Sequence, residues 1–412
     1  MTPFFQYIRL RLTANVVSTV IVLTSLCISF VPYTGFRSWP VSNPQVRAID
    51  FKNIGFRPGN DDTVAIPLTA PTTGTLNLAA LYVSFNDMPA LSLAEVNKLL
   101  FSPSTFSLST YIASASYGRA RLSGRTIGPL HLSASCDASQ IERAAVDRAT
   151  EDNDLSSYEH VIVITPASCG SPLVSASVRA QNIRARTGKT IRTTLAIIQV
   201  SKRNASLFVA HAVHEFGHGL GLGHAGSLRR FPIDDRDLES AGYDEYGDVF
   251  SAMGIAKLLS RDSVPIGHYN APHKARLGWL ARDEVRFLTP NDFAWIGSYT
   301  DKYAVYRAAV LPIGQNWLWF EHRQPDDPFE RSLQFLSESI FEGALMHVET
   351  ALPDSGRTYL LTSVRGPDDV LLGGQSWSHS PYRTRVEITT AKRGIGIRVK
   401  TANGQNWFVK GM

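Results

Sequence analysis

Two histidines and a glutamate in the stretch "HEFGH" have the spacing of a metal site on a helix. His214 and His218 are four positions apart, so on an α-helix they lie on one face and both imidazoles can bind the same ion. Glu215 is rotated by about 100° from His214 around the helix axis. That position suits a group that acts on a water molecule at the ion better than it suits a third ligand. The pattern therefore indicates catalysis at a metal rather than a core helix with satisfied histidines.

His224 supplies a third candidate ligand a short distance after His218. Catalytic zinc typically takes three protein ligands and keeps a fourth position for water. The step between these two histidines is too long for one helix face, so the helix must end between them. Glycine adopts left-handed backbone conformations without a Cβ clash, and Gly221 is the expected pivot. His211 precedes His214 by one helical turn and is interpreted as a neighbour rather than a ligand.

The whole stretch "HEFGHGLGLGH" resembles the metzincin signature HExxHxxGxxH, and metzincins carry a methionine turn beneath their zinc ion. The block "EYGDVFSAMG" supplies Met253 for that turn, and Tyr246 and Asp248 in it are candidates to order the turn or line the cleft. With "NAPHKARLGWL" and "SYGRARLSG", these segments look most like the gametolysin-like metzincin peptidases over residues 76–285. Some metzincins have a tyrosine zinc ligand two residues after the methionine, but Ile255 stands there, so no fifth ligand is expected from it.

The resemblance implies a zinc-dependent endopeptidase that acts on extracellular matrix or cell-wall proteins. His214, His218 and His224 would hold one zinc ion, which lowers the pKa of its bound water and polarises the scissile carbonyl. Glu215 would take the proton of this water and later deliver it to the leaving amine. The expected partner is therefore a protein or peptide substrate.

Two other interpretations of the motif remain open at this point. A non-catalytic zinc-containing binding or adhesion module could keep the same fold, although such descendants usually lose the glutamate or a ligand. A thermolysin-like peptidase would take its third ligand from a glutamate on a later helix, for which Glu239 and Glu245 are available. His224 at the metzincin spacing makes these glutamates unnecessary as ligands.

The three cysteines indicate an exported protein. Cys27 lies in the apolar N-terminal segment, which leaves Cys136 and Cys169 as a pair that can form a disulfide in an oxidising compartment. Two buried free thiols are the alternative. The sequence "SCGSP" around Cys169 superficially resembles the cysteine switch of matrix metalloproteinases. It follows a predicted strand inside the catalytic region rather than lying in a pro-segment, so the disulfide is the favoured interpretation.

The N-terminus and the charge pattern define the expected location and exclude some partners. No charged residue occurs between Leu12 and Phe36, and Arg9 and Arg11 precede this apolar stretch. This is the pattern of a secretory signal peptide or a signal anchor. Frequent Ser and Thr favour a cleaved signal and a secreted enzyme, with a membrane tether and an external catalytic domain as the alternative. The net charge of +5 comes from scattered basic residues, so no nucleic-acid partner is expected.

Strands and helices alternate up to residue 285, which predicts an α/β (α+β) catalytic domain around the active-site helix. The apolar runs "LNLAALYVSF", "HVIVITP" and "TTLAIIQV" are typical of buried strands. Helices are expected at "SLAEVNKLLF", where Ser92 and Glu95 form a capping box, at residues 106–116 and at "SQIERAAVDRAT". The segment "SYGRARLSGRTIGPLHL" is interpreted as two strands that turn at Ser123-Gly124.

Helical periodicity fades after the catalytic region. Short, often alternating segments such as "NWLWFEH", "GALMHVETA" and "GIGIRVKT" predict an all-β, sandwich-like C-terminal domain. The sequence thus predicts a signal peptide or signal anchor at 1–36 and a linker or pro-like segment at 37–75. A metzincin-like catalytic domain follows at 76–285, and a β-rich domain at 286–412.

Overall fold

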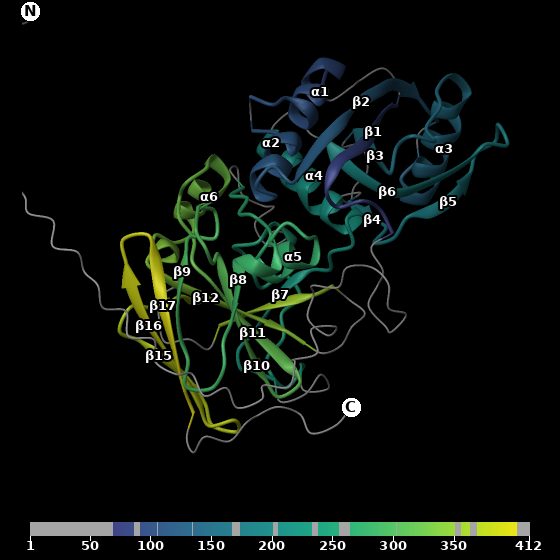
Figure 1. Ribbon diagram of the computed structural model, residues 1–412. Coiled ribbons are helices and arrows are strands. Elements are labelled where there is room, and N and C mark those ends of the chain that lie inside the picture. Colours follow the sequence, from purple (N-terminus) through teal and green to yellow (C-terminus); the bar gives the residue numbers. More distant parts are fainter. Residues whose placement is uncertain are drawn as a thin grey trace, which may run out of the picture. The chain divides into compact units, whose positions relative to one another are not determined.

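A sheet of six strands forms the framework of the first part of the described chain in a computed structural model of the protein (Figure 1). The chain divides after Ile49, and every described residue lies in the second unit. None of the described helices is long and apolar enough to cross a membrane. The predicted signal or anchor, residues 1–36, lies outside the described residues. The structure describes residues 69–401 apart from 86–90, 105, 134, 167–173, 201–204, 233–237, 255–263, 302, 351–355 and 363–368.

The strand order of this first sheet is β2-β1-β3-β6-β4, and β5 also pairs with β6. The pairs β1–β2, β1–β3 and β3–β6 are parallel, whereas β4 and β5 run antiparallel to β6. Parallel strands covered on both faces read as continuous apolar runs, and the three strands predicted from such runs are confirmed as β1, β3 and β6. The strands are β1 (Gly74–Ser84), β2 (Ala120–His131), β3 (His160–Pro166), β4 (Ser175–Ala176), β5 (Gln181–Arg184) and β6 (Thr190–Val200).

The prediction of two strands turning at Ser123-Gly124 is wrong. The segment is one strand, β2, which pairs in parallel with β1 along its length. Gly124 is needed for another reason, because a Cβ there would overlap the backbone carbonyl oxygen of Leu78 on β1. A glycine inside a strand can mark a close backbone approach as well as a turn, and here the close approach is the cause.

Helices cover both faces of the first sheet (Figure 1). Helices α1 (Leu93–Phe101), α2 (Leu108–Ala115) and α4 (Ala205–Gly219) share one hydrophobic core with the β1 side chains that point to their face, while α3 (Ala138–Asp152) packs on the opposite face. The predicted capping box at the start of α1 is confirmed. Ser92 Oγ accepts from the backbone N–H of Glu95 at 3.2 Å, and Glu95 Oε2 accepts from the backbone N–H of Ser92 at 2.7 Å.

Two further sheets follow in the chain. The first has the order β7-β13-β12-β11-β10-β8 with β14 paired to β12, and the second has the order β15-β16-β17-β9. Side chains of both sheets share one hydrophobic core, which is the arrangement of a β-sandwich. The strands are β7 (Ala225–Leu228), β8 (Val285–Phe287), β9 (Phe293–Gly297), β10 (Ala308–Ile313), β11 (Asn316–Glu321), β12 (Gly343–Glu349), β13 (Thr358–Leu361), β14 (Leu371–Leu372), β15 (Ser376–His379), β16 (Thr384–Ala391) and β17 (Gly394–Thr401).

The C-terminal sheets are joined to the first part of the chain by shared elements. Strand β7 comes directly after the histidine motif, yet it pairs in parallel with β13 of the C-terminal region. The short helix α5 (Ala271–Arg276) packs on β11, and α6 (Pro328–Ser332) interrupts the β-rich region between β11 and β12. The structure is therefore a mixed α+β fold with several sheets. The division at residue 285 stays a prediction.

Cys136 is disulfide-bonded. The two other cysteines of the chain, Cys27 and Cys169, both lie outside the described residues, so the pairing of Cys136 with Cys169 stays a prediction.

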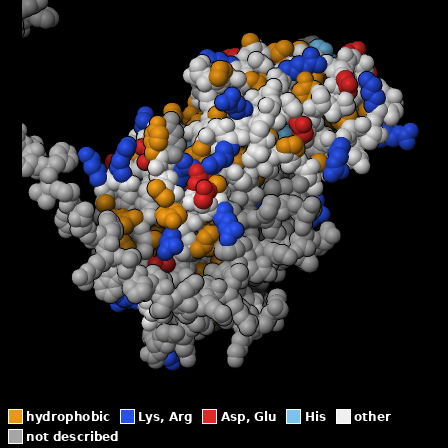
Figure 2. Space-filling model, viewed as in Figure 1, with side chains coloured by type: hydrophobic (Ala, Val, Ile, Leu, Met, Phe, Trp, Pro, Cys, Tyr) orange, Lys and Arg blue, Asp and Glu red, His pale blue; other side chains and the backbone are white. Residues whose placement is uncertain are grey.

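On the face shown in Figure 2, Lys and Arg side chains are spread among acidic, polar and apolar ones.

Candidate metal site

Helix α4 presents the first two candidate ligands from a buried position. Its apolar residues pack against β6 and into the core shared with α1 and α2. His214 and Glu215 are almost fully buried, and His218 near the end of the helix is half-buried. Hydrophobic packing on several sides thus fixes the axis of the helix and the direction in which these side chains point.

Helix α4 ends at Gly219, and Gly221, two residues later, adopts a left-handed conformation with φ +94°. The backbone N–H of Leu222 donates to Gly217 O at 3.0 Å, and that of Gly221 donates to His218 O at 2.8 Å. These two bonds form a Schellman motif, the usual way in which a glycine terminates a helix. The chain then enters β7, and His224 lies immediately before that strand. The turn therefore carries the third histidine back toward the first two.

The three predicted ligands meet in space. One ligand atom of each of His214, His218 and His224 lies within 4.8 Å of the others, a spacing at which they could hold one metal ion. The ring centroids of His214 and His218 are 4.8 Å apart, and those of His218 and His224 are 4.9 Å apart. A helix face and a turn after it thus bring together residues that the sequence separates.

Each of the three rings has its Nδ1 against an oxygen acceptor. His214 Nδ1 lies 2.9 Å from Ala252 O, and His218 Nδ1 lies 2.8 Å from Leu222 O. His224 Nδ1 lies 2.8 Å from a carboxylate oxygen of Glu245. A carbonyl or carboxylate oxygen can only accept, so Nδ1 carries the proton and Nε2 keeps its lone pair. This is the tautomer that a histidine needs to bind a metal through Nε2, and the donor set fits a zinc ion.

Burial also keeps these rings in the neutral form that binds a metal. It lowers the pKa of His218 to about 4 and that of His214 well below the usual histidine value. Burial lowers the pKa of His224 as well, although its hydrogen bond to Glu245 opposes the effect. The rings are therefore neutral ligands near pH 7, and no proton has to leave before a metal binds.

Glu215 follows His214 on α4 and is not part of the three-histidine cluster. Its side chain is 4% exposed, and its Oε2 atom has no hydrogen-bond partner among the described residues. Burial raises the pKa of Glu215 to about 8. A divalent cation held by the three histidines would oppose this effect, because a nearby positive charge favours the carboxylate. Glu215 thus combines a raised pKa with an oxygen that has no hydrogen-bond partner among the described residues.

His211 does not belong to the three-histidine cluster. It lies one turn earlier on α4 and is buried, and neither of its ring nitrogens has a hydrogen-bond partner in the described part of the chain. Burial lowers its pKa to about 4, so the ring is neutral near pH 7. The structure shows His211 as a buried neighbour of the cluster.

Met253 packs directly against the backbone of the helix. A Cβ added at Gly217 would overlap the Met253 sulfur and lie 3.0 Å from the Tyr269 hydroxyl oxygen. That hydroxyl donates to Val213 O at 2.7 Å. The methionine therefore lies under the segment that carries the histidines, and the glycine at position 217 leaves the room for it.

The turn that carries Met253 depends on a second glycine. A Cβ at Gly254 would overlap the backbone oxygen of Asp248 and lie 2.7 Å from Ala225 O, next to His224. We expect Gly254→Ala to destabilise the protein by about 1–3 kcal/mol, because a rigid backbone must move to make room. Chemical denaturation of the two proteins measures this difference. A variant as stable as the wild type would show that the backbone of this turn can move aside for a Cβ at little cost.

Glu245, one of the two glutamates available to a thermolysin-like site, instead serves as the partner of His224. The backbones of Ser227 and Asp244 exchange two hydrogen bonds of 2.8 and 3.0 Å, which brings Glu245 beside the histidine. Glu239 is exposed in the preceding turn. Sequence spacing did not reveal the His224–Glu245 contact, because it depends on backbone pairing between Ser227 of β7 and Asp244.

Tyr246 and Asp248, the two other candidates from the sequence, lie in different surroundings. The Tyr246 ring centroid lies 4.3 Å from that of His224, so this side chain borders the cluster. Asp248 is completely buried and lies within the turn. Ile255 and the segment around Cys169 lie outside the described residues.

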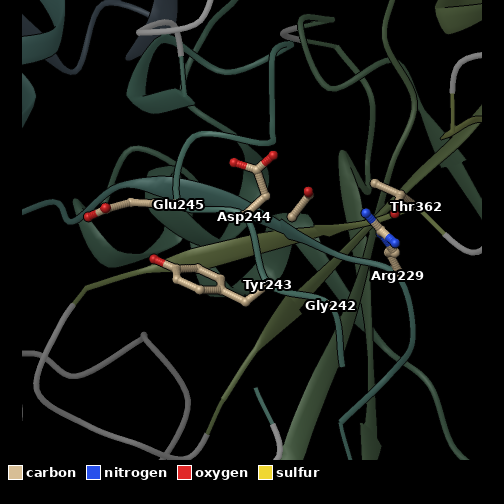
Figure 3. A pocket seen from close by; sticks show the side chains of 7 residues that line it. Arg229, Gly242, Tyr243, Asp244, Glu245 and Thr362 are labelled. Carbon is tan, nitrogen blue, oxygen red and sulfur yellow. The ribbon is translucent and has the colours of Figure 1, made fainter. Parts of the chain in front are cut away.

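A cavity of about 580 Å³ adjoins the site through Glu245. In Figure 3, Glu245 and Tyr243 lie on one side of it, and Arg229 and Thr362 on the other. Its walls are mainly polar, and of its lining residues the sequence analysis had singled out Glu245, as a candidate ligand. The residues that line it are Ser227, Arg229, Gly242, Tyr243, Asp244, Glu245 and Thr362.

The comparisons with known proteins do not identify a function for this chain, so the geometry of the site has to carry the functional argument. No protein-family model and no curated protein matches the chain. One similar solved structure is a catalytically inactive OgpA from Akkermansia muciniphila in complex with an O-glycopeptide (glycodrosocin) substrate. It shares 12% sequence identity, covers 63% of this chain and 73% of its own, and has a TM-score of 0.28. A TM-score this low supports neither a shared fold nor a shared activity.

Proposed function

We propose that the protein is a zinc-dependent endopeptidase of the metzincin type, similar to the gametolysin-like enzymes. The observation that carries this proposal is the cluster of His214, His218 and His224, each with Nδ1 on an oxygen acceptor and Nε2 left for a metal. Glu215 follows His214 on the same helix, and one of its carboxylate oxygens has no hydrogen-bond partner in the described part of the chain. Three neutral nitrogen ligands and one adjacent carboxyl group are the parts that a catalytic zinc site needs.

The residues have separate roles in this proposal. The three histidines hold the ion, which when bound supplies the Lewis acidity that polarises a scissile carbonyl and makes water more acidic. Glu215 accepts a proton from the attacking water and returns it to the leaving amine nitrogen. Burial around Glu215 keeps bulk water away from this proton, and Glu245 holds the His224 ring in the orientation that the ion requires.

Two features of the sequence support the proposed substrate class and the proposed location of the enzyme. The resemblance to gametolysin-like enzymes favours extracellular matrix or cell-wall proteins as substrates. The apolar N-terminal segment favours secretion, or a membrane anchor that leaves the catalytic part outside the cell.

The test is casein hydrolysis by the purified mature protein with and without a chelator, alongside a direct measurement of bound metal. We expect about one zinc per chain, cleavage within the substrate chain, and loss of cleavage after chelation that added zinc restores. Bound zinc should also raise the unfolding temperature, because a ligand that binds only the folded state stabilises it. Zinc binding without cleavage of casein or of a broad peptide library would contradict the peptidase and support a non-catalytic binding module.

A further inference from the structure

The turn at residues 248–253, here called the Met253 turn, holds part of the metal site. Its Ala252 carbonyl oxygen accepts the hydrogen bond from His214 Nδ1, and its Met253 packs under α4. Inside the turn, the backbone N–H of Phe250 donates to Asp248 Oδ1 at 3.2 Å, and that of Ser251 donates to Asp248 O at 3.2 Å. The position of Asp248 therefore determines where Ala252 and Met253 lie.

Residues of the C-terminal β region hold this turn from outside. His347 on β12 places Nε2 3.0 Å from Asp248 Oδ2, and both side chains are 0% exposed. Asn270, the N-cap of α5, donates to the same carboxylate oxygen at 3.0 Å. Arg323, just after β11, donates from Nη1 to Phe250 O at 2.7 Å. Two strands far along the chain thus fix a turn that touches a candidate ligand.

The contact between His347 and Asp248 joins two groups that are both removed from water. Burial by itself would raise the pKa of Asp248, but the nearby His347 and Arg323 and the hydrogen bond from Asn270 hold it below its usual value. The carboxylate is therefore charged and depends on its donors. If one of these donors is removed, the buried Asp248 carboxylate loses a hydrogen bond that water cannot replace. The carboxylate and the turn around it are then expected to shift.

We propose that His347 is a positioning residue of the metal site, which it orients through Asp248, Ala252 and the Nδ1 atom of His214. This rests on the proposed zinc site, and it gives the C-terminal β region a role in metal binding. The chain of contacts runs from β12 to the Met253 turn and from there to α4. The first and last links are hydrogen bonds between buried groups, and the backbone of the turn joins Asp248 to Ala252. Partners that orient a metal-binding histidine typically contribute a factor of about 10–100 to metal affinity.

The experiment compares His347→Leu with the wild type in the full-length mature protein. Zinc affinity is measured by competition with a chromophoric chelator, and the visible spectrum of the Co²⁺-loaded protein reports the ligand geometry. We expect roughly tenfold weaker zinc binding and a changed Co²⁺ spectrum. His347→Gln keeps an N–H donor for Asp248 and should recover most of the affinity. Thermal unfolding of the metal-free proteins confirms that each variant is folded.

His322→Leu is the matched control. His322 is also a buried histidine of the C-terminal region, but its ring bonds to Gly343 O at 2.8 Å and to the Gln324 side chain. This variant should lose stability without changing the Co²⁺ spectrum. Wild-type zinc affinity and spectrum in His347→Leu would overturn the role of His347 alone. A wild-type protein that binds no zinc would overturn the metal site itself, and the inference with it.

Discussion

Replacing Glu215 with glutamine is expected to lower peptide hydrolysis by about 10²–10⁴-fold, which is the usual contribution of a general acid–base group. Glutamine has nearly the same size and fits the same buried position, but its amide can neither accept the proton of the attacking water nor return it to the amine. The three histidines keep their own partners in this variant, because none of their Nδ1 contacts involves Glu215. Zinc should therefore stay bound.

Two measurements separate this result from simple damage to the site. The rate of peptide cleavage is compared at equal zinc occupancy, and bound zinc is quantified after gel filtration. Glu239→Gln is the control, because this exposed glutamate lies in the same stretch of chain but outside the three-histidine cluster. Cleavage by Glu215→Gln at the wild-type rate would show that another group transfers the proton. Loss of zinc in the same variant would instead assign Glu215 a role in binding the ion.

The second large effect is expected at Arg323, where Arg323→Met should destabilise the protein by about 3–5 kcal/mol. The guanidinium is fully buried between the carboxylates of Glu321 and Glu330, which are themselves 0% exposed. Arg323 Nε donates to Glu321 Oε1 at 2.8 Å, and Nη1 lies 3.3 Å from Glu330 Oε1. Methionine fills a similar volume but leaves two buried negative charges without their cation.

Chemical denaturation with linear extrapolation measures this loss. Lys400→Met is the control, because Lys400 pairs with Glu387 at 2.8 Å on the exposed face of β16 and β17, and such surface pairs contribute at most about 1 kcal/mol. An Arg323→Met variant as stable as this control would show that the carboxylates become protonated or find other donors. Since Arg323 also holds the Met253 turn through Phe250 O, any Arg323→Met protein that still folds should bind zinc more weakly.

Residues close together in the chain determined much of the candidate site. The four-residue step from His214 to His218 is a property of the helix itself, and Gly221 ends that helix because a left-handed turn strains other residues. The buried strands β1, β3 and β6 were predictable for a similar reason, since a continuous apolar run is stable only when it is covered. In each case the interaction that decides the structure lies within a few residues.

Local patterns failed where the deciding contact is distant in sequence. Gly124 was interpreted as a turn, because a glycine that makes room for a neighbouring strand has the same local pattern as one that reverses the chain. No strand was predicted at residues 225–228, which as β7 pair with β13, a strand more than a hundred residues later in the chain. Strands pair through backbone groups that all residues share, so a single sequence does not show which distant strands will pair.

The sequence by itself determined the residue types of the candidate site: three histidines, one glutamate and the turn that joins them. Only the tertiary structure decided how these residues are held in place. The partners of the histidine Nδ1 atoms are Ala252 O, Leu222 O and Glu245, and the buried donors of Asp248 come from α5 and β12. The physical reason is that a metal ligand's identity is a property of its side chain, whereas its orientation depends on which distant groups the folded chain buries beside it.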